Sequence, residues 1–185
     1  DFCVNLDNDG KYLYFFISTY NKDVREQGVA VARMAYADRN APVGRVMKWY
    51  QGRWSEPGLG GHVTPIYTPK IDWHSENCDV LWGPSVHWNT HIQQWVMLLN
   101  RAKDKDWSQE GIYVSFSPDL SQPRQWSEPK KILDGDMKTV HWYPQVIGMN
   151  ASARETDKRA DCVARLFVKG TSNWEIVFLK AGEAE

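Results

Sequence analysis

Three segments between predicted strands interleave carboxylates with tryptophan and histidine. They contain the candidate residues Asp72, His74, Trp107, Glu110, His141 and Trp142. Two carboxyl groups can hydrolyse a glycosidic bond when one is protonated as the acid and the other is ionised as base or nucleophile. Aromatic planes and imidazoles suit the apolar faces and the hydroxyl groups of a sugar. The residue types therefore indicate a glycan or polyol ligand, although polar loops of this composition also occur without a site.

Asp1 and Glu110 are the carboxylates whose positions favour catalysis. Asp1 directly precedes a predicted strand, and Glu110 directly precedes a strand-initial glycine, the position that Gln27 holds earlier in the chain. We therefore predict Asp1 as the base or charge-orienting carboxylate and Glu110 as the acid. His141 stands just before another predicted strand, where it would hydrogen-bond to sugar hydroxyl groups.

Tryptophan is unusually frequent, with 10 residues in a chain of 185. Trp82, Trp107 and Trp142 lie beside the polar segments, and we predict that they form a platform on which a sugar ring stacks. His87 follows Val86 on a predicted strand, so it is either a buried structural histidine or a ligand to the sugar.

Composition excludes several other functions. The net charge of −1 gives no electrostatic basis for binding nucleic acid or an anionic membrane. No apolar run approaches the roughly 20 residues of a membrane-spanning helix. His74 and Cys78 lack two further ligands for zinc, so we predict no metal and no cofactor. The cellular location is left open, with a secreted or periplasmic protein favoured if the substrate is a sugar.

The elements that must position these residues are short strands that repeat along the chain. Each unit opens with a related segment, and the next strands are rich in aromatic and β-branched residues. The opening segments are DFCVNLD at 1–7, LWGPSVHWN at 81–89 and WYPQVIGMN at 142–150.

Two further motifs repeat in the same order. The tetrapeptide WSEP begins at Trp54 and again at Trp126, and GVAV at Gly28 matches GIYV at Gly111. In the first unit the fourth strand is predicted over 46–54. Repetition of four short strands is typical of a β-propeller, whereas a sandwich would not explain the second WSEP.

We therefore predict one all-β domain over 1–185, built as a β-propeller of four-stranded antiparallel blades. The blade units are 1–58, 82–133 and 142–180. This amounts to about two and a half blades, and a propeller closes with roughly four to eight. Blades preceding Asp1 or another copy of the chain would have to complete the ring.

The motifs GPSVHWN, EGIYVSFSPDL, QWSEPKKIL and WYPQVIG resemble the five-bladed β-propeller glycosidases of families 43, 32 and 68. The resemblance covers nearly the whole chain and implies an Asp base, a second Asp that orients it, and a Glu acid on successive blades. Asp1 matches the base, although Phe2 replaces the strand-initial proline. Gly83 stands where the second Asp would be, and Trp82 and Trp142 stand where the acid would be.

Two functions follow from this comparison. One is a glycoside hydrolase-like protein that acts on a carbohydrate in the central channel. The other is a non-catalytic propeller that binds a carbohydrate or a protein and lacks the full set of catalytic carboxylates. They differ in whether two carboxyl groups face each other across the channel, roughly 5 to 10 Å apart.

Overall fold

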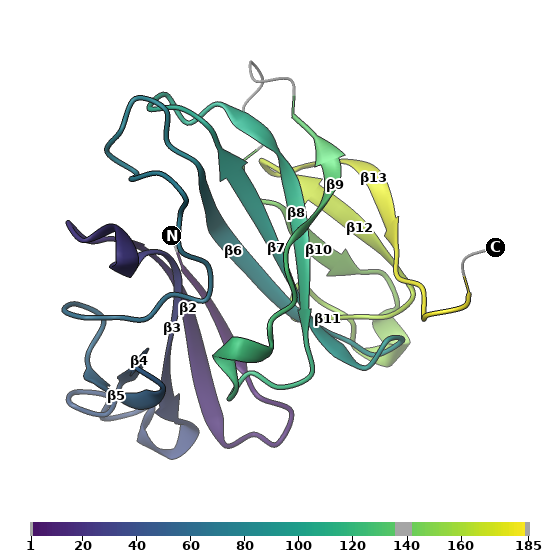
Figure 1. The fold of residues 1–185 in the computed structure, drawn as a ribbon. Coiled ribbons are helices and arrows are strands. Elements are labelled where there is room, and N and C mark those ends of the chain that lie inside the picture. Colours follow the sequence, from purple (N-terminus) through teal and green to yellow (C-terminus); the bar gives the residue numbers. More distant parts are fainter. Residues whose placement is uncertain (1, 136–141, 184–185) are drawn as a thin grey trace.

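The computed structural model describes residues 2–135 and 142–183 and is all-β, as the sequence predicts (Figure 1). The first sheet has the order β1-β2-β3-β4-β5 and is antiparallel throughout. Its strands are β1 (Phe2–Leu6), β2 (Tyr12–Tyr20), β3 (Gln27–Ala35), β4 (Met47–Tyr50) and β5 (Arg53–Pro57).

The second sheet has the order β11-β6-β7-β8-β9, and the third has the order β10-β12-β13. The second sheet contains β6 (Val80–Asn89), β7 (Gln94–Ala102), β8 (Gln109–Ser117), β9 (Lys130–Asp134) and the short parallel strand β11 (Arg159–Ala160). The third sheet contains β10 (Gln145–Gly148), β12 (Val163–Val168) and β13 (Thr171–Val177). The helical segments of the described residues are short 3-10 turns at Val24–Glu26, Tyr36–Asp38, Pro123–Gln125 and Ala151–Ala153.

Local chemistry explains how the first hairpin forms. Aromatic and β-branched residues dominate β2, and such side chains suit a pleated, half-buried surface. The turn before it is closed by Asp7, whose carboxylate accepts hydrogen bonds from the backbone N–H of Lys11 at 2.7 Å and of Tyr12 at 3.2 Å. Gly10 adopts a φ of 70°, a conformation that favours glycine.

The three sheets are stacked face to face and share two hydrophobic interfaces. Phe16 and Val31 of the first sheet pack with Met97 of the second in one buried cluster. Val114 and Leu166 belong to a second cluster, which joins the second sheet to the third. The second sheet is thus covered on both faces, as its nearly continuous buried β7 requires.

The first strands of the three units lie next to one another. Asn5 on β1 is buried, and its side-chain amide donates a 2.8 Å hydrogen bond to the carbonyl of Val86 on β6. The backbone N–H of Val86 in turn lies 3.4 Å from the sulfur of Cys3. Side chains of β1 therefore connect the first sheet to the second without a β-ladder between them.

The predicted fourth strand at 46–54 is wrong in detail. The structure divides this region into β4 and β5, which form a hairpin through Gln51 and Gly52, both with positive φ. As a result, the first WSEP lies on the strand after the fourth, whereas the second lies before the fourth strand, β9. The two tetrapeptides therefore do not occupy equivalent places in the repeat.

The tryptophans of both WSEP motifs nevertheless pack against the same hydrophobic cluster, the one shared by the first and second sheets. Trp54 packs edge-on against Tyr14 of its own sheet, with ring centroids 5.9 Å apart. Trp126 comes from the second sheet and packs edge-on against Phe16 of the first, also at 5.9 Å. Trp126 therefore packs between the first and second sheets, whereas the ring contact of Trp54 lies within the first sheet, and the predicted register between the two motifs is wrong.

Candidate functional site

A pocket of about 500 Å³ opens where the first strands of the three units meet, and we call it the central pocket. It is lined by the start of β1, by Gly83, Pro84 and Ser85 of β6, by the residues that lead into β10, and by Lys158. The register of β6 with β7 shifts between Trp82 and Ser85. Such bulges re-aim side chains and are frequent beside functional sites.

Two exposed aromatic side chains border the central pocket. Phe2 is 73% exposed and Tyr143 is 50% exposed. Tyr143 has a φ of 58°, which is uncommon for a bulky residue and costs free energy. Its backbone N–H donates a 2.9 Å hydrogen bond to the side-chain oxygen of Asn100, a buried residue of β7. The second sheet thus holds Tyr143 in a strained conformation at the rim of the pocket.

Replacing Asn100 with alanine should release this conformation. We expect Asn100→Ala to lower the free energy of unfolding by about 1–3 kcal/mol, because a buried hydrogen-bond acceptor is lost. Urea denaturation followed by tryptophan fluorescence measures this. Asn77→Ala is the control because Asn77 is exposed, and it should change the value by less than about 0.5 kcal/mol. Equal stability of the two variants would contradict the role of Asn100.

Lys158 contributes the one cationic side chain among the described residues of the central pocket. Its ammonium group lies 3.2 Å from the sulfur of Cys3 and so bridges the third unit and β1. The backbone carbonyl of Lys158 accepts a 2.9 Å hydrogen bond from the N–H of Trp88, which fixes this segment on β6. Gln145 and Ser85 add an amide and a hydroxyl group to the lining.

The predicted tryptophan platform is a packed aromatic cluster near the start of β6. Trp82 is 4% exposed and meets Trp107 at 5.0 Å and Trp142 at 5.9 Å, with ring planes 78° and 75° apart. Trp73, which was not among the predicted platform residues, lies 4.5 Å from Trp107 and is buried. The structure therefore brings the three predicted tryptophans together, but edge to face, with Trp107 and Trp142 half-buried.

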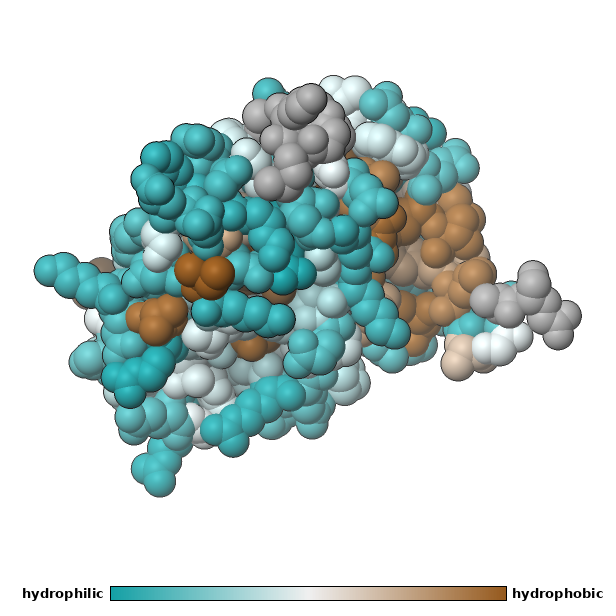
Figure 2. All heavy atoms as spheres, turned by 45° about the horizontal axis from the view of Figure 1, so that its top comes forward, coloured by the Kyte–Doolittle hydropathy of each residue, from teal (hydrophilic) through white to brown (hydrophobic). Residues whose placement is uncertain are grey.

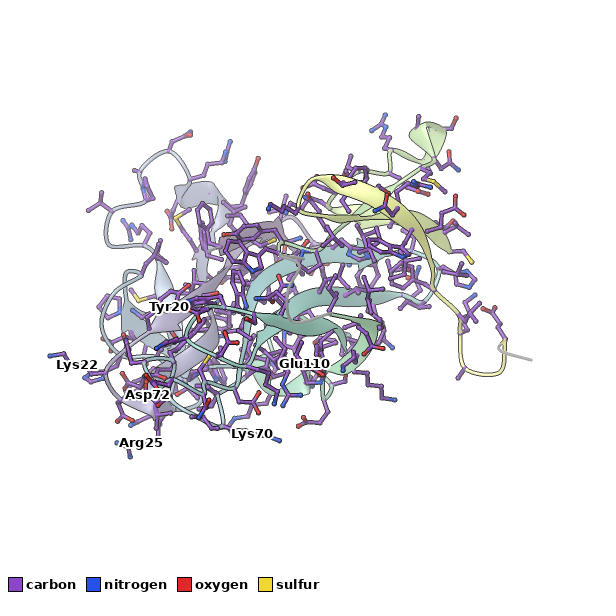
Figure 3. The ribbon with its side chains drawn as sticks, turned by 90° about the horizontal axis from the view of Figure 1, so that it is seen from above. Tyr20, Lys22, Arg25, Lys70, Asp72 and Glu110 are labelled. Carbon is purple, nitrogen blue, oxygen red and sulfur yellow. The ribbon has the colours of Figure 1, made fainter. Side chains whose placement is uncertain are left out.

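Asp72 lies on the first sheet's side of the molecule, near Tyr20 (Figure 3), and forms a local turn with His74. The carboxylate of Asp72 accepts hydrogen bonds from the backbone N–H of His74 at 2.8 Å and from the amide of Gln27 at 3.1 Å. The backbone hydrogen bond from His74 is the main reason that the pKa of Asp72 lies below its usual value. The turn presents Trp73, whose indole N–H donates to the carbonyl of Thr19 at 3.0 Å.

Glu110 lies over the second sheet, apart from Tyr20 and Asp72 (Figure 3). Its carboxylate accepts a hydrogen bond from the hydroxyl of Tyr113 and forms an ion pair with Lys131. Burial alone would raise the pKa of Glu110, but the hydrogen bonds from Lys131 and Tyr113 outweigh it, and the pKa is lowered. The carboxylate is therefore ionised at neutral pH, whereas a general acid must carry a proton.

The register of the strands corrects the position assigned to Glu110. Gly28 pairs with Thr19 and Gly111 pairs with Arg101, and the next pairs are Gln27 with Tyr20 and Gln109 with Ala102. The residue equivalent to Gln27 is therefore Gln109. Both glutamines are buried, whereas Glu110 is the extra residue of a bulge.

An ion-pair network beside Glu110 fixes the segment that leads into β6. Arg101 binds both carboxylate oxygens of Asp79, at 2.7 and 2.9 Å, and donates to the hydroxyl of Tyr113 at 3.1 Å. Lys103 also contacts Asp79 at 3.0 Å. Bidentate pairing of this kind is geometrically specific, so the network favours a structural role for these charges.

His87 is buried between the second and third sheets. It is 1% exposed, its ring lies 5.5 Å from that of Phe178, and its Nε2 atom has no hydrogen-bond partner. Burial, with a smaller contribution from Lys158, lowers the pKa of His87 to about 3. Of the two alternatives for this residue, the structure shows the buried neutral histidine.

The predicted Asp1 and His141 lie outside the described residues. Tyr143 and Lys158 were missed at the sequence level: Lys158 belongs to no repeated motif, and Tyr143 stands in the opening segment 142–150 beside Trp142, which was chosen for its residue type. The Tyr143-Pro144 dipeptide just before β10 was the one available signal, since Gly83-Pro84 stands at the matching place in β6.

Within the described residues, no helix has the length and apolar character needed to cross a membrane. In the same part of the chain, no group of three or more His, Cys, Asp or Glu side chains is placed to hold a metal ion. No protein-family model matches the sequence, and no curated protein matches it either.

Proposed function

We propose that the chain is a carbohydrate-binding unit of a β-propeller resembling the five-bladed glycosidases, with the central pocket as its binding site. The three stacked sheets would be successive blades, and further blades or another copy of the chain would complete the ring. The observation that carries the proposal is that β1, β6 and the entry to β10, the first strands of three repeated units, line one pocket. In a propeller the first strand of each blade borders the central channel.

The chemistry of the pocket suits a sugar. Phe2 and Tyr143 offer exposed rings to the apolar face of a pyranose, and Ser85, Gln145 and Lys158 offer hydrogen-bonding groups to its hydroxyls. Its volume of about 500 Å³ lies within the roughly 300–1,000 Å³ typical of small-molecule sites. The strain at Tyr143 supports a binding role, because strained residues cluster at functional sites.

Binding is favoured over hydrolysis. Among the described residues, the lining of the central pocket contains no carboxylate. Glu110 is engaged by Lys131 and Tyr113 and does not line the pocket. Glycoside hydrolysis requires two carboxyl groups flanking the scissile bond. We therefore expect retention of a glycan without turnover.

A glycan array should identify an oligosaccharide ligand, and calorimetry should then measure its affinity. We expect Tyr143→Gly to weaken binding at least about tenfold, because the aromatic contact is lost, an effect of about 1.4 kcal/mol. Glycine tolerates the positive φ at this position, so this variant should fold normally. Tyr36→Gly would test a comparably exposed tyrosine away from the central pocket and should keep wild-type affinity.

A panel of aryl glycosides separates binding from hydrolysis. We expect no turnover by the wild type. Turnover that is abolished by Glu110→Gln would contradict the proposal and restore the acid role of that residue. Failure of every glycan to bind, or equal affinity of the wild type and Tyr143→Gly, would remove the central pocket as the site.

A further inference from the structure

The third sheet ends at an open edge, next to an apolar groove. Its order is β10-β12-β13, so among the described residues β13 has a sheet neighbour on one side. A groove of about 360 Å³ runs between this edge and the second sheet. Figure 2 shows apolar surface gathered over this part of the molecule. We call it the edge groove, and its lining includes Val114, Phe116, Leu133, Ile176, Val177 and Leu179.

The edge groove is continuous with the buried interface of the second and third sheets. Val114, Leu166 and Phe178 line the groove and also belong to the hydrophobic cluster beneath it. Val177 and Leu179 are nevertheless 54% and 49% exposed. The hydrophobic interface between the second and third sheets thus extends to the molecular surface, where Val177 and Leu179 are exposed to solvent.

The other two sheets show what covers the equivalent position. In the first sheet the third strand, β3, carries the antiparallel fourth strand β4, and in the second sheet β8 carries β9. In the third sheet the third strand is β13. Within residues 2–135 and 142–183, no strand therefore takes at β13 the place that β4 and β9 take at β3 and β8.

The register extends this equivalence to single residues. Alignment of Gly28 with Gly111 makes Val31 equivalent to Val114 and Phe16 equivalent to Leu98. Phe16 and Val31 are covered by Trp126, which stands four positions before the start of β9. The position over Val114 that corresponds to the position of Trp126 over Val31 lies in the edge groove.

We propose that the edge groove binds an extended polypeptide segment that adds a fourth, antiparallel strand to β13. The segment would insert a large aromatic side chain over Val114 and pair its backbone with the edge of β13. Strand addition of this kind takes its affinity from main-chain hydrogen bonds and its specificity from pockets for alternate side chains. The inference is independent of the sugar site, because it concerns the opposite edge of the third sheet from β10.

A second copy of the chain fits this role less well. Its own β13 is one of several edge strands, and Trp174 of that strand already lines the edge groove of its own chain. β5 and β9 are also edge strands, but the tryptophans of their WSEP motifs already pack inside their own chain, Trp54 on Tyr14 and Trp126 on Phe16. The groove requires a strand that is free to pair with β13 and an aromatic side chain that is free to cover Val114. An extended segment with a tryptophan before its strand, like residues 123–134, supplies both.

The test uses a fluorescein-labelled peptide with the sequence of residues 123–134, PRQWSEPKKILD, and the intact chain. Fluorescence anisotropy should show one peptide bound per chain. We expect Val177→Lys and Leu179→Lys each to weaken binding at least about tenfold, because a charge would have to be buried against the peptide. Both residues are exposed, so the variants should fold. Val43→Lys is the matched control, since Val43 is 93% exposed and lies outside the edge groove, and it should bind like the wild type.

The peptide itself supplies a second test. The same peptide with Trp126→Ala should bind at least about tenfold more weakly, because the aromatic contact over Val114 is lost. No binding of the unchanged peptide up to millimolar concentration would overturn the proposal, as would equal binding by the wild type and Val177→Lys. A stable dimer in light scattering that Val177→Lys dissociates would assign the groove to a second copy instead.

Discussion

Acidification below pH 6.5 should lower the free energy of unfolding by roughly 1.4 kcal/mol per pH unit through His87 alone. Burial, and to a lesser degree Lys158, lowers the pKa of this imidazole from 6.5 to about 3 in the folded chain. Between these two values the unfolded state binds a proton that the folded state excludes. The contribution of His87 is therefore fully present above pH 6.5 and is lost as the pH falls toward 3, by a total on the order of 5 kcal/mol.

Urea denaturation of the wild type and of His87→Gln at pH 7, 6, 5 and 4 measures this contribution. Carboxylates such as Asp79, whose pKa is lowered mainly by Arg101, also destabilise the fold in acid, so the difference between the two proteins is the informative quantity. We expect the variant to lose stability less steeply below pH 6.5. His74→Gln is the matched control, because the His74 side chain is 63% exposed, and it should keep the wild-type slope. Parallel curves for the wild type and His87→Gln would contradict a buried neutral histidine.

His87 also shows which features of the structure could be predicted from the sequence. The sequence predicted only that His87 follows Val86 on a strand, and the structure turns the two to opposite faces, with Val86 toward the first sheet and His87 toward Phe178. Periodicity predicts such facing because successive side chains of a strand alternate. Periodicity does not predict that both faces of β6 are buried, because the face with His87 is covered by the third sheet, which is distant in the chain.

The strand positions were predictable for a similar reason. Turn signals such as Asn8-Asp9-Gly10 and runs of aromatic and β-branched residues are local, and runs of this kind form β2 and β8. The errors arose where the pairing of neighbouring strands departs from a regular repeat. One inserted residue at Glu110 moves the equivalent of Gln27 to Gln109, and a bulge of this kind leaves no mark in the local sequence.

The candidate site was less predictable than the fold. Carboxylates and tryptophans were predicted as site residues because of their residue types. In the structure Glu110 is ion-paired with Lys131, and Trp82 is enclosed by other aromatic rings. Tyr143 gains its place at the central pocket from a hydrogen bond with Asn100, 43 residues earlier in the chain. A site assembled from three strand ends becomes visible only when the sheets are stacked.

The two WSEP tetrapeptides allow the effect of tertiary position to be measured with local sequence held constant. We expect Trp126→Ala to lower the free energy of unfolding by about 3–5 kcal/mol, because it empties a buried space between two sheets. Trp126 is 8% exposed and covers Phe16. Trp54→Ala should cost less, about 1–2 kcal/mol including the lost contact with Arg33, whose guanidinium carbon lies 4.4 Å from the ring centre, because Trp54 is only half-buried.

Chemical denaturation of both variants and of the wild type under one set of conditions gives the comparison. Propensity arguments assign the two tryptophans the same effect, since Ser, Glu and Pro follow each of them. A larger loss for Trp126→Ala therefore isolates the contribution of the contact between the first and second sheets. Equal losses would mean that this contact adds nothing beyond the local motif, and the same logic would then remove the reason to place a tryptophan over Val114 in the edge groove. The stability of Trp126→Ala thus bears on both the stacking of the sheets and the strand proposed to extend the third.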